Sequence, residues 1–178
     1  MKQIMTISTA VWLAAVPAFA QSAAVGPNPY TSNAKAQSEQ VRSLVLRTAE
    51  KVPEELYAFK PTPDVRSLGS VLGHIADGNV LLCGIANGDK PSFAQVHEKK
   101  TTRAELVAAL KESFAACDKV FAATTDANGT TPITMFGQPQ SRLGVLIFNN
   151  SHMWEHYGNL VTYMRLKNIV PPSSEQSR

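Results

Sequence analysis

The chain has 178 residues and a formal net charge of +3, values that describe one ordinary globular domain. A charge this small, without a run of basic residues interleaved with aromatic ones, gives no reason to expect nucleic acid as a partner. Neither of the two cysteines belongs to a C-x-x-C or C-x-x-C-H motif. This excludes the simple thioredoxin, zinc-ribbon and c-type haem classes.

The first twenty residues predict a secretory signal peptide. Lys2 supplies a short positive start, an apolar run extends from Ile4 to Val16, and a small-residue cleavage site ends at Ala20. The run of about thirteen apolar residues is shorter than the roughly 20 that a membrane-spanning helix needs. We therefore expect a mature chain that begins at Gln21 in a periplasmic or secreted location.

The mature chain reads as four helices joined by loops. Residues 21–31 form an extended lead, since Pro27 and Pro29 interrupt any helix. Apolar periodicity and end signals then predict helices at about 33–52, 67–86, 102–121 and 141–168. Residues 88–100 and 124–140 form two long loops, and residues 171–178 form a mobile tail.

Strand-like alternation is nearly absent from this pattern. The segment Ile133-Thr-Met-Phe136 could form a short strand, but no partner strand is evident. We expect an all-α four-helix bundle over residues 32–170. No segment after the leader reads as long and apolar enough to cross a membrane, so stable membrane insertion is not expected.

The sequence His152-Met-Trp-Glu-His156 places two imidazoles four residues apart in the last predicted helix. Residues at this spacing lie one above the other on the same helix face, so both rings could reach one metal ion. His74 lies at the edge of the apolar face of the second helix and would be a third ligand. Three neutral imidazoles make an open site that suits zinc, nickel, copper or iron. The alternative is a set of hydrogen-bonded core histidines without a metal.

The spelling H-x-x-E-H also matches the motif of inverzincin proteases. Those enzymes need an acidic third ligand well downstream, and the only acid after His156 is Glu175 in the tail. We therefore expect the match to be accidental.

Three further polar residues have less certain roles. Glu155 could act as a general base, lie behind the ligands, or be a solvated acid on the helix surface. Asp77, three residues after His74, could orient its ring, although a surface acid is the simpler interpretation. His97 lies in the polar sequence HEKK and is interpreted as a surface residue.

Taken together, these residues resemble the DinB/YfiT-like metal-binding four-helix bundles. The resemblance covers nearly all of the mature chain and rests on KPTPDVRSLGSVLGHIAD around His74 and NNSHMWEHYGNLVTYMRLKNIVPPSS around His152 and His156. It implies a divalent metal ion, most often zinc or nickel, bound by these three histidines. It also implies an up-down-down-up order of helices with a long crossover loop between the second and third.

That order bears on Cys83 and Cys117, which export would place in an oxidising compartment. In parallel helices they would lie at nearly the same height, whereas in an antiparallel hairpin they would be roughly 18 Å apart. The loop at 88–100 can extend to roughly 40 Å, enough to cross the bundle. With the family's order we expect parallel helices and a Cys83–Cys117 disulfide. The alternative is two separate buried thiols.

Two functions remain open. The first is an exported metal-dependent hydrolase or transferase that acts on a small molecule, with Glu155 as the candidate catalytic residue. Some relatives of this type are thiol-dependent transferases or isomerases, but an oxidising compartment does not supply their cytosolic thiols in quantity. The second is a non-catalytic metal- or ligand-binding bundle. The sequence leaves a homodimer open in either case.

Overall fold

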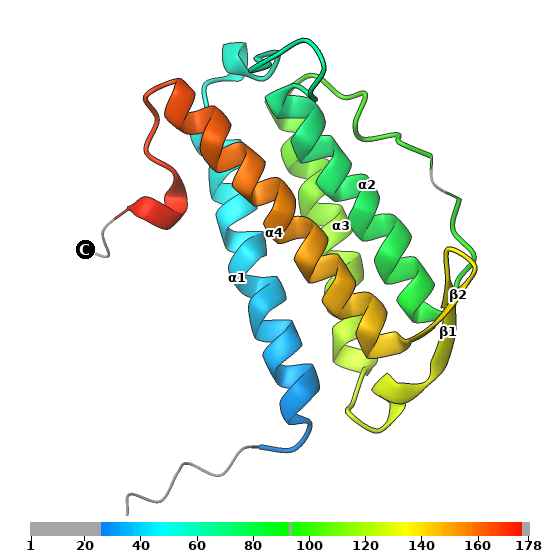
Figure 1. The fold of residues 1–178 in the computed structure, drawn as a ribbon. Coiled ribbons are helices and arrows are strands. Elements are labelled where there is room, and N and C mark those ends of the chain that lie inside the picture. Colours follow the sequence, from blue (N-terminus) through cyan, green and yellow to red (C-terminus); the bar gives the residue numbers. More distant parts are fainter. Residues whose placement is uncertain (1–25, 93, 176–178) are drawn as a thin grey trace, which may run out of the picture.

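The computed structural model describes residues 26–92 and 94–175, which form four long helices and one β-hairpin (Figure 1). The helices are α1 (Pro29–Lys51), α2 (Leu68–Asn87), α3 (Arg103–Ala123) and α4 (Arg142–Leu166). The hairpin consists of β1 (Pro132–Met135) and β2 (Gln138–Ser141), and single 3-10 turns occur at Glu54–Leu56, Asn128–Thr130 and Pro172–Ser174. The predicted signal peptide lies outside the described residues.

Contacts between α2 and α3 define their relative direction. Gly69, near the start of α2, lies beside Leu106 near the start of α3. Close to the other ends, Cys83 and Cys117 form a disulfide with their Cα atoms 5.2 Å apart. The two helices therefore run in the same direction, and residues 88–92 and 94–102 belong to the connection that returns along the bundle from the end of α2 to the start of α3 (Figure 1).

Helices α1 and α4 also run side by side in one direction. Asn150 donates a hydrogen bond to the Ala34 carbonyl at the beginning of both helices, and Lys51 at the end of α1 donates to the Val170 carbonyl beyond α4. Asn149 near the start of α4 donates to Asn79 in the second half of α2 at 3.0 Å. The pair α1 and α4 is thus antiparallel to the pair α2 and α3 (Figure 1).

The apolar sides of the four helices meet in a core made of two clusters, one containing Leu72 and the other containing Leu146. Its largest fully buried side chains include Leu72, Ile75, Leu106, Leu146, Met153 and Leu160. Asn79, the polar exception in the apolar face of α2, is also fully buried. Its amide donates to Ser113 at 3.3 Å and accepts from Asn149, so the cost of burying it is met by hydrogen bonds.

Helix α2 is more apolar than the sequence interpretation allowed. Among the described helices it alone is long and apolar enough to cross a membrane, with a mean hydropathy of 1.4 in its best window. However, 78% of that window is buried inside the bundle. Its apolar character therefore has an explanation in the packing of α2 against α3 and α4, where core helices need apolar residues on most sides.

The first helix begins earlier than predicted. Pro29 is its first residue and does not belong to an extended lead. Proline is tolerated there, since the first residues of a helix have no intrahelical acceptor for their N–H groups. Asp126 accepts from the backbone N–H groups of Tyr30 and Thr31 at 3.2 and 2.8 Å. The beginning of α1 is therefore capped by a residue from the loop after α3.

The expectation that the possible strand near Ile133 has no partner was wrong. β1 pairs with β2 in an antiparallel hairpin, and Met135 lies opposite Gln138 across the turn formed by Phe136 and Gly137. Both turn residues have positive φ, 51° and 78°. Those angles match the two-residue turns that the right-handed twist of a hairpin favours, and glycine at the second position adopts them without strain.

The first five residues of the predicted tail contact the bundle. Residues 171 and 172 are buried, and the Ser173 N–H donates to the Tyr157 hydroxyl at 3.0 Å. Glu175 forms ion pairs with Arg47 and Lys51 of α1. Residues 171–175 therefore pack back onto the bundle.

Candidate metal centre

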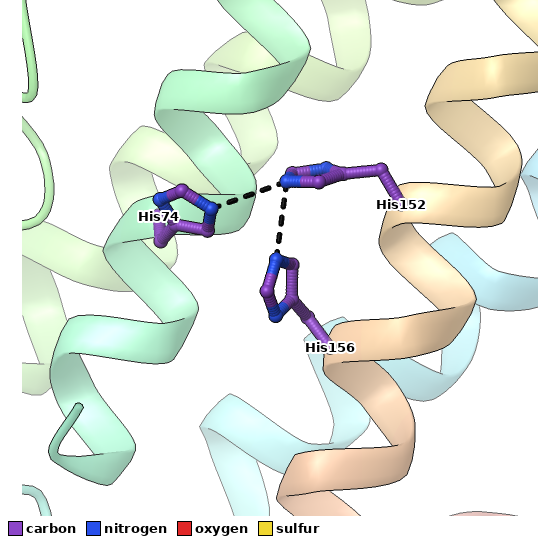
Figure 2. Close-up of side chains that lie close together, drawn as sticks. All are labelled: His74, His152 and His156. Atoms are coloured by element: carbon purple, nitrogen blue, oxygen red, sulfur yellow. Dashed lines mark hydrogen bonds between the residues drawn. The ribbon is translucent and has the colours of Figure 1, made fainter. Parts of the chain in front are cut away.

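Three histidines converge between α2 and α4, as expected from the sequence (Figure 2). His152 and His156 project from successive turns of α4 toward His74 on α2. The Nε2 atom of His152 lies 3.2 Å from Nε2 of His74 and 3.1 Å from Nε2 of His156. One ring nitrogen from each histidine lies within 4.8 Å of the other two.

These spacings fit a single metal ion. Zinc–imidazole bonds are about 2.0–2.1 Å long, so two nitrogens 3.1–3.2 Å apart would subtend an angle of about 100° at the ion. That angle lies between the octahedral and tetrahedral values. Three ligands in this arrangement leave coordination positions for another group, as in catalytic rather than structural zinc sites.

Gly78 on α2 makes room for His152. A Cβ atom at this position would lie 2.5 Å from Cε1 of His152 and 3.0 Å from its Nδ1. Any larger residue would push the imidazole away from the other two. The sequence analysis gave Gly78 no role.

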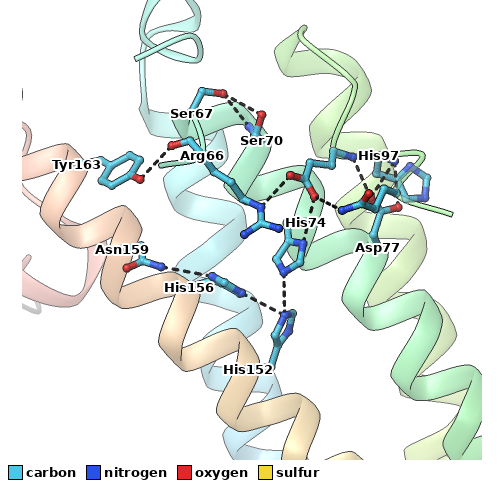
Figure 3. Close-up of polar contacts among 12 residues, drawn as sticks. Arg66, Ser67, Ser70, His74, Asp77, His97, His152, His156, Asn159 and Tyr163 are labelled. Atoms are coloured by element: carbon cyan, nitrogen blue, oxygen red, sulfur yellow. Dashed lines mark hydrogen bonds and ion pairs between the residues drawn. The ribbon is translucent and has the colours of Figure 1, made fainter. Parts of the chain in front are cut away.

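Glu98 fixes the orientation of His74. Its Oε2 atom lies 3.2 Å from Nδ1 of His74, and its Oε1 atom accepts from Nε of Arg66 at 2.8 Å (Figure 3). A carboxylate beside Nδ1 favours the tautomer that carries its proton there, which leaves the Nε2 lone pair directed at the other histidines. This is the arrangement found behind metal-bound histidines in proteins.

Asp77 acts on the site through the loop, not through the ring of His74. Its carboxylate accepts from the backbone N–H of His97 at 3.0 Å and from that of Glu98 at 2.9 Å (Figure 3). Gly73 allows the same loop to approach α2, because a Cβ there would lie 2.3 Å from the His97 carbonyl oxygen. His97 is partly buried against the helix, so the interpretation as a surface residue was wrong.

The other two imidazoles have less complete surroundings. The side-chain amide of Asn159 lies 3.4 Å from Nδ1 of His156. Because amide oxygen and nitrogen exchange places on a flip, its oxygen can accept from Nδ1–H when Nε2 faces the other rings. Nδ1 of His152 is buried without a hydrogen-bond partner among the described residues.

All three histidines are held neutral at physiological pH. Burial and, to a smaller extent, the neighbouring imidazoles lower the pKa of His152 and of His156 to about 4. Burial also lowers the pKa of His74, with Arg66 acting in the same direction and Glu98 opposing it. Neutral imidazole is the form that binds metal ions, so the site is ready to coordinate without first losing protons.

The histidines separate two pockets of different character. A polar pocket of about 590 Å³ is lined by His156 together with Arg66, Glu98, Glu155 and Asn159. An apolar pocket of about 760 Å³ lies on the other side and is lined by His74 and His152, the second half of α2 and the hairpin.

Glu155 is exposed and lines the polar pocket beside His156. Its negative charge favours the protonated form of His156, against the larger effect of burial. The residue thus lies near the candidate metal centre, and its role as a general base stays a prediction.

Sequence reasoning missed Glu98 and Arg66. Neither is spaced regularly from a histidine, and Glu98 comes from a polar loop 24 residues after His74. Two residues of α2 could have indicated that a loop docks there. Gly73 lacks a side chain and leaves space for the loop, and the Asp77 carboxylate accepts hydrogen bonds from its backbone.

Comparison with known proteins agrees with the fold. The family model of the DinB superfamily matches residues 37–160, so the chain belongs to this superfamily. The match includes all three histidines. No curated protein is similar enough in sequence to count as a match.

Several solved structures share the fold at low sequence identity. A DinB-like protein from Bacillus cereus ATCC 10987 superposes with a TM-score of 0.67 at 16% identity, over 81% of this chain and 94% of that one. A DinB-like protein from Bacillus subtilis gives 0.63 at 17%, over 82% and 99%. The mycothiol-dependent maleylpyruvate isomerase gives 0.63 at 12%, over 73% of this chain and 60% of that one.

Proposed function

We propose that the protein is an exported divalent-metal-binding member of the DinB superfamily that catalyses a hydrolase or transferase reaction on a small molecule. The observation that carries the proposal is the convergence of three neutral imidazoles: Nε2 of His152 lies 3.2 Å from Nε2 of His74 and 3.1 Å from Nε2 of His156. Zinc and nickel are the favoured ions, since imidazole ligands suit both.

A bound divalent ion would supply Lewis-acid polarisation of a substrate group and a lower pKa for a water molecule. The chain's own residues would hold the reactants. The His74 ring is oriented by Glu98, and Arg66 places a positive charge at the rim of the polar pocket. The Glu155 carboxylate lines the same pocket and is the candidate acceptor of a proton from the attacking group.

The balance between hydrolysis and group transfer depends on location. The similar isomerase depends on mycothiol, a thiol cosubstrate. Export, which the leader sequence predicts, would remove this chain from cytosolic thiols, and the buried Cys83–Cys117 disulfide supports an oxidising compartment. The predicted export and the disulfide both favour hydrolysis.

A second candidate is a metal-containing ligand carrier without catalytic activity. The apolar pocket of about 760 Å³ beside the histidines favours it, because this volume suits binding of a small molecule.

The decisive experiment is metal analysis of the exported, purified protein, followed by a screen with ester, amide and thiol-transfer substrates. We expect about one zinc or nickel ion per chain, lost in a His74→Ala variant. Turnover that requires metal and falls in Glu155→Gln supports the enzyme, and bound metal without turnover of any substrate supports the carrier. A wild-type protein that binds no divalent ion contradicts both.

A further inference from the structure

The apolar pocket extends away from the histidines along one face of α2. Leu81, Leu82 and Ile85 line it on the helix side, after His74 and Gly78. From His74 to Ile85 the helix rises by about 16 Å at 1.5 Å per residue. The pocket is therefore elongated, with the histidines at one end.

The opposite wall of the pocket comes from the hairpin and the start of α4. Thr134 and Phe136 of the hairpin and Phe148 of α4 line it. Phe136 and Phe148 are 64% and 44% exposed, which is costly for two large aromatic side chains unless another apolar group covers them.

The polar pocket on the far side of the histidines has the opposite chemistry. It is lined by charged side chains of both signs, with Lys60 and Arg66 beside Asp64, Glu98 and Glu155, so polar groups would be favoured there. A molecule whose reacting bond lies at the histidines would have one part in each environment.

We propose that the substrate carries an apolar acyl or aryl group next to its reacting bond, and that the pocket between α2, Phe148 and the hairpin binds this group. The reacting polar part then lies at the histidines and extends toward Arg66. This inference rests on the proposed function for the reacting end, whereas the binding of the apolar group depends only on the pocket.

The test uses n-alkyl hydroxamates of increasing chain length, because the hydroxamate group chelates zinc and the chain probes the pocket. Dissociation constants are measured by calorimetry on the full mature protein, both zinc-loaded and metal-free. Each methylene that enters the pocket should tighten binding about fourfold, the equivalent of about 0.8 kcal/mol per buried CH₂. A Kd that does not change with chain length in either form overturns the proposal.

Variants separate the pocket from nonspecific apolar binding. Thr134→Trp should fill the pocket and abolish the chain-length dependence, because Thr134 is exposed on the pocket side of β1. Gln138→Trp adds the same side chain opposite Met135 and should leave the dependence intact. Equal effects of the two tryptophans would overturn the proposal.

A smaller change tests the aromatic wall. Phe148→Ala should weaken octanoyl hydroxamate about tenfold and leave acetohydroxamate unchanged, whereas Ile147→Ala on the same helix, equally exposed but outside the pocket lining, should change neither. If the wild-type protein binds no zinc but its affinity for hydroxamates still rises with chain length, the proposed function is rejected. The binding of an apolar group in the pocket is then still supported.

Discussion

At the scale of single residues, the candidate metal centre depends on side chains behind the histidines as well as on the histidines. Glu98 holds the tautomer of His74, and Gly78 provides the space that His152 occupies. Each makes a different prediction for metal affinity.

Replacing Glu98 should weaken metal binding without unfolding the protein. We expect Glu98→Gln to reduce zinc affinity about 10- to 100-fold, because the ring of His74 loses the carboxylate that orients it and raises its basicity. Competition with a chromogenic chelator measures the affinity. Glu112→Gln, at an exposed position on α3, is the matched control. Equal affinities of the two variants would contradict the role of Glu98.

Adding one methyl group at Gly78 should also weaken zinc binding. In Gly78→Ala the new Cβ would lie 2.5 Å from His152 Cε1 and displace that ring. Alanine has a better helix propensity than glycine by about 1 kcal/mol, so the helix itself should persist.

Gly158→Ala is the control for this substitution. A Cβ at Gly158 meets no atom within 4 Å, so the variant should gain about 0.5–1 kcal/mol in stability and keep full zinc affinity. Calorimetric titration and urea unfolding give the two quantities. Unchanged affinity in Gly78→Ala would show that His152 does not need its observed position.

At the scale of elements, the crossover loop between α2 and α3 is part of the site. Asp77 accepts hydrogen bonds from two backbone N–H groups of this loop, and the loop in turn presents Glu98 to His74. The loop is thus fixed by α2 at the same place where it supports the metal centre.

Asp77→Ala should therefore release the loop. We expect faster hydrogen exchange at the backbone amides of His97 and Glu98, and a loss of zinc affinity similar to that of Glu98→Gln. In the double variant of Asp77 and Glu98 the losses should not add, since both act through His74. Fully additive losses would indicate that Asp77 acts by another route.

The disulfide joins α2 to α3 and should stabilise the bundle strongly. It closes a loop with a sequence separation of 34, for which chain entropy predicts about 3–4 kcal/mol. Urea unfolding with and without reductant measures this difference, and a Cys83→Ser/Cys117→Ser variant should show no response to reductant. A reductant effect of the same size in that variant would contradict the assignment.

The helices were predictable from sequence because their signals are local. Apolar periodicity and the Thr102–Glu105 capping box predict α3 within one residue of its start. The i,i+4 spacing of His152 and His156 likewise predicts that both face one side of α4. His74 was predicted from its place at the edge of the apolar face of the second helix, and the family resemblance then implied the same residue.

Two of the features that sequence reasoning missed are determined by contacts distant in sequence, and the third is a strand with a weak composition signal. The start of α1 is fixed by Asp126, which is 95 residues from Thr31 in sequence. Glu98 reaches His74 only because its loop docks on α2. The second hairpin strand, Gln138–Ser141, lacks β-branched and aromatic residues, so its composition gave no strand signal.

At the scale of the whole molecule, the buried neutral histidines couple folding to pH. The pKa of His152 and of His156 is about 4 in the folded protein, whereas an unburied histidine has a pKa of 6.5. Below pH 6.5 the unfolded chain therefore binds protons that the folded protein does not. This destabilises the metal-free protein as pH falls to about 4, and the effect levels off below.

Urea unfolding of metal-free protein between pH 7.5 and 3.5 tests this coupling. The free energy of unfolding should fall more steeply from pH 6.5 to 4 in the wild type than in a His152→Asn/His156→Asn variant, which lacks both groups. Carboxylates titrate in both proteins, so the difference isolates the histidines. Parallel curves would contradict the low pKa values.

The presence of only two cysteines in the sequence has a consequence for how the protein matures. Within one chain, Cys83 and Cys117 can make a single pairing, so no wrong intramolecular bridge competes with the native one. Oxidative folding then requires an electron acceptor but no isomerase to reshuffle bonds. A host strain that lacks a disulfide isomerase should therefore yield the native bridge as readily as one that has it.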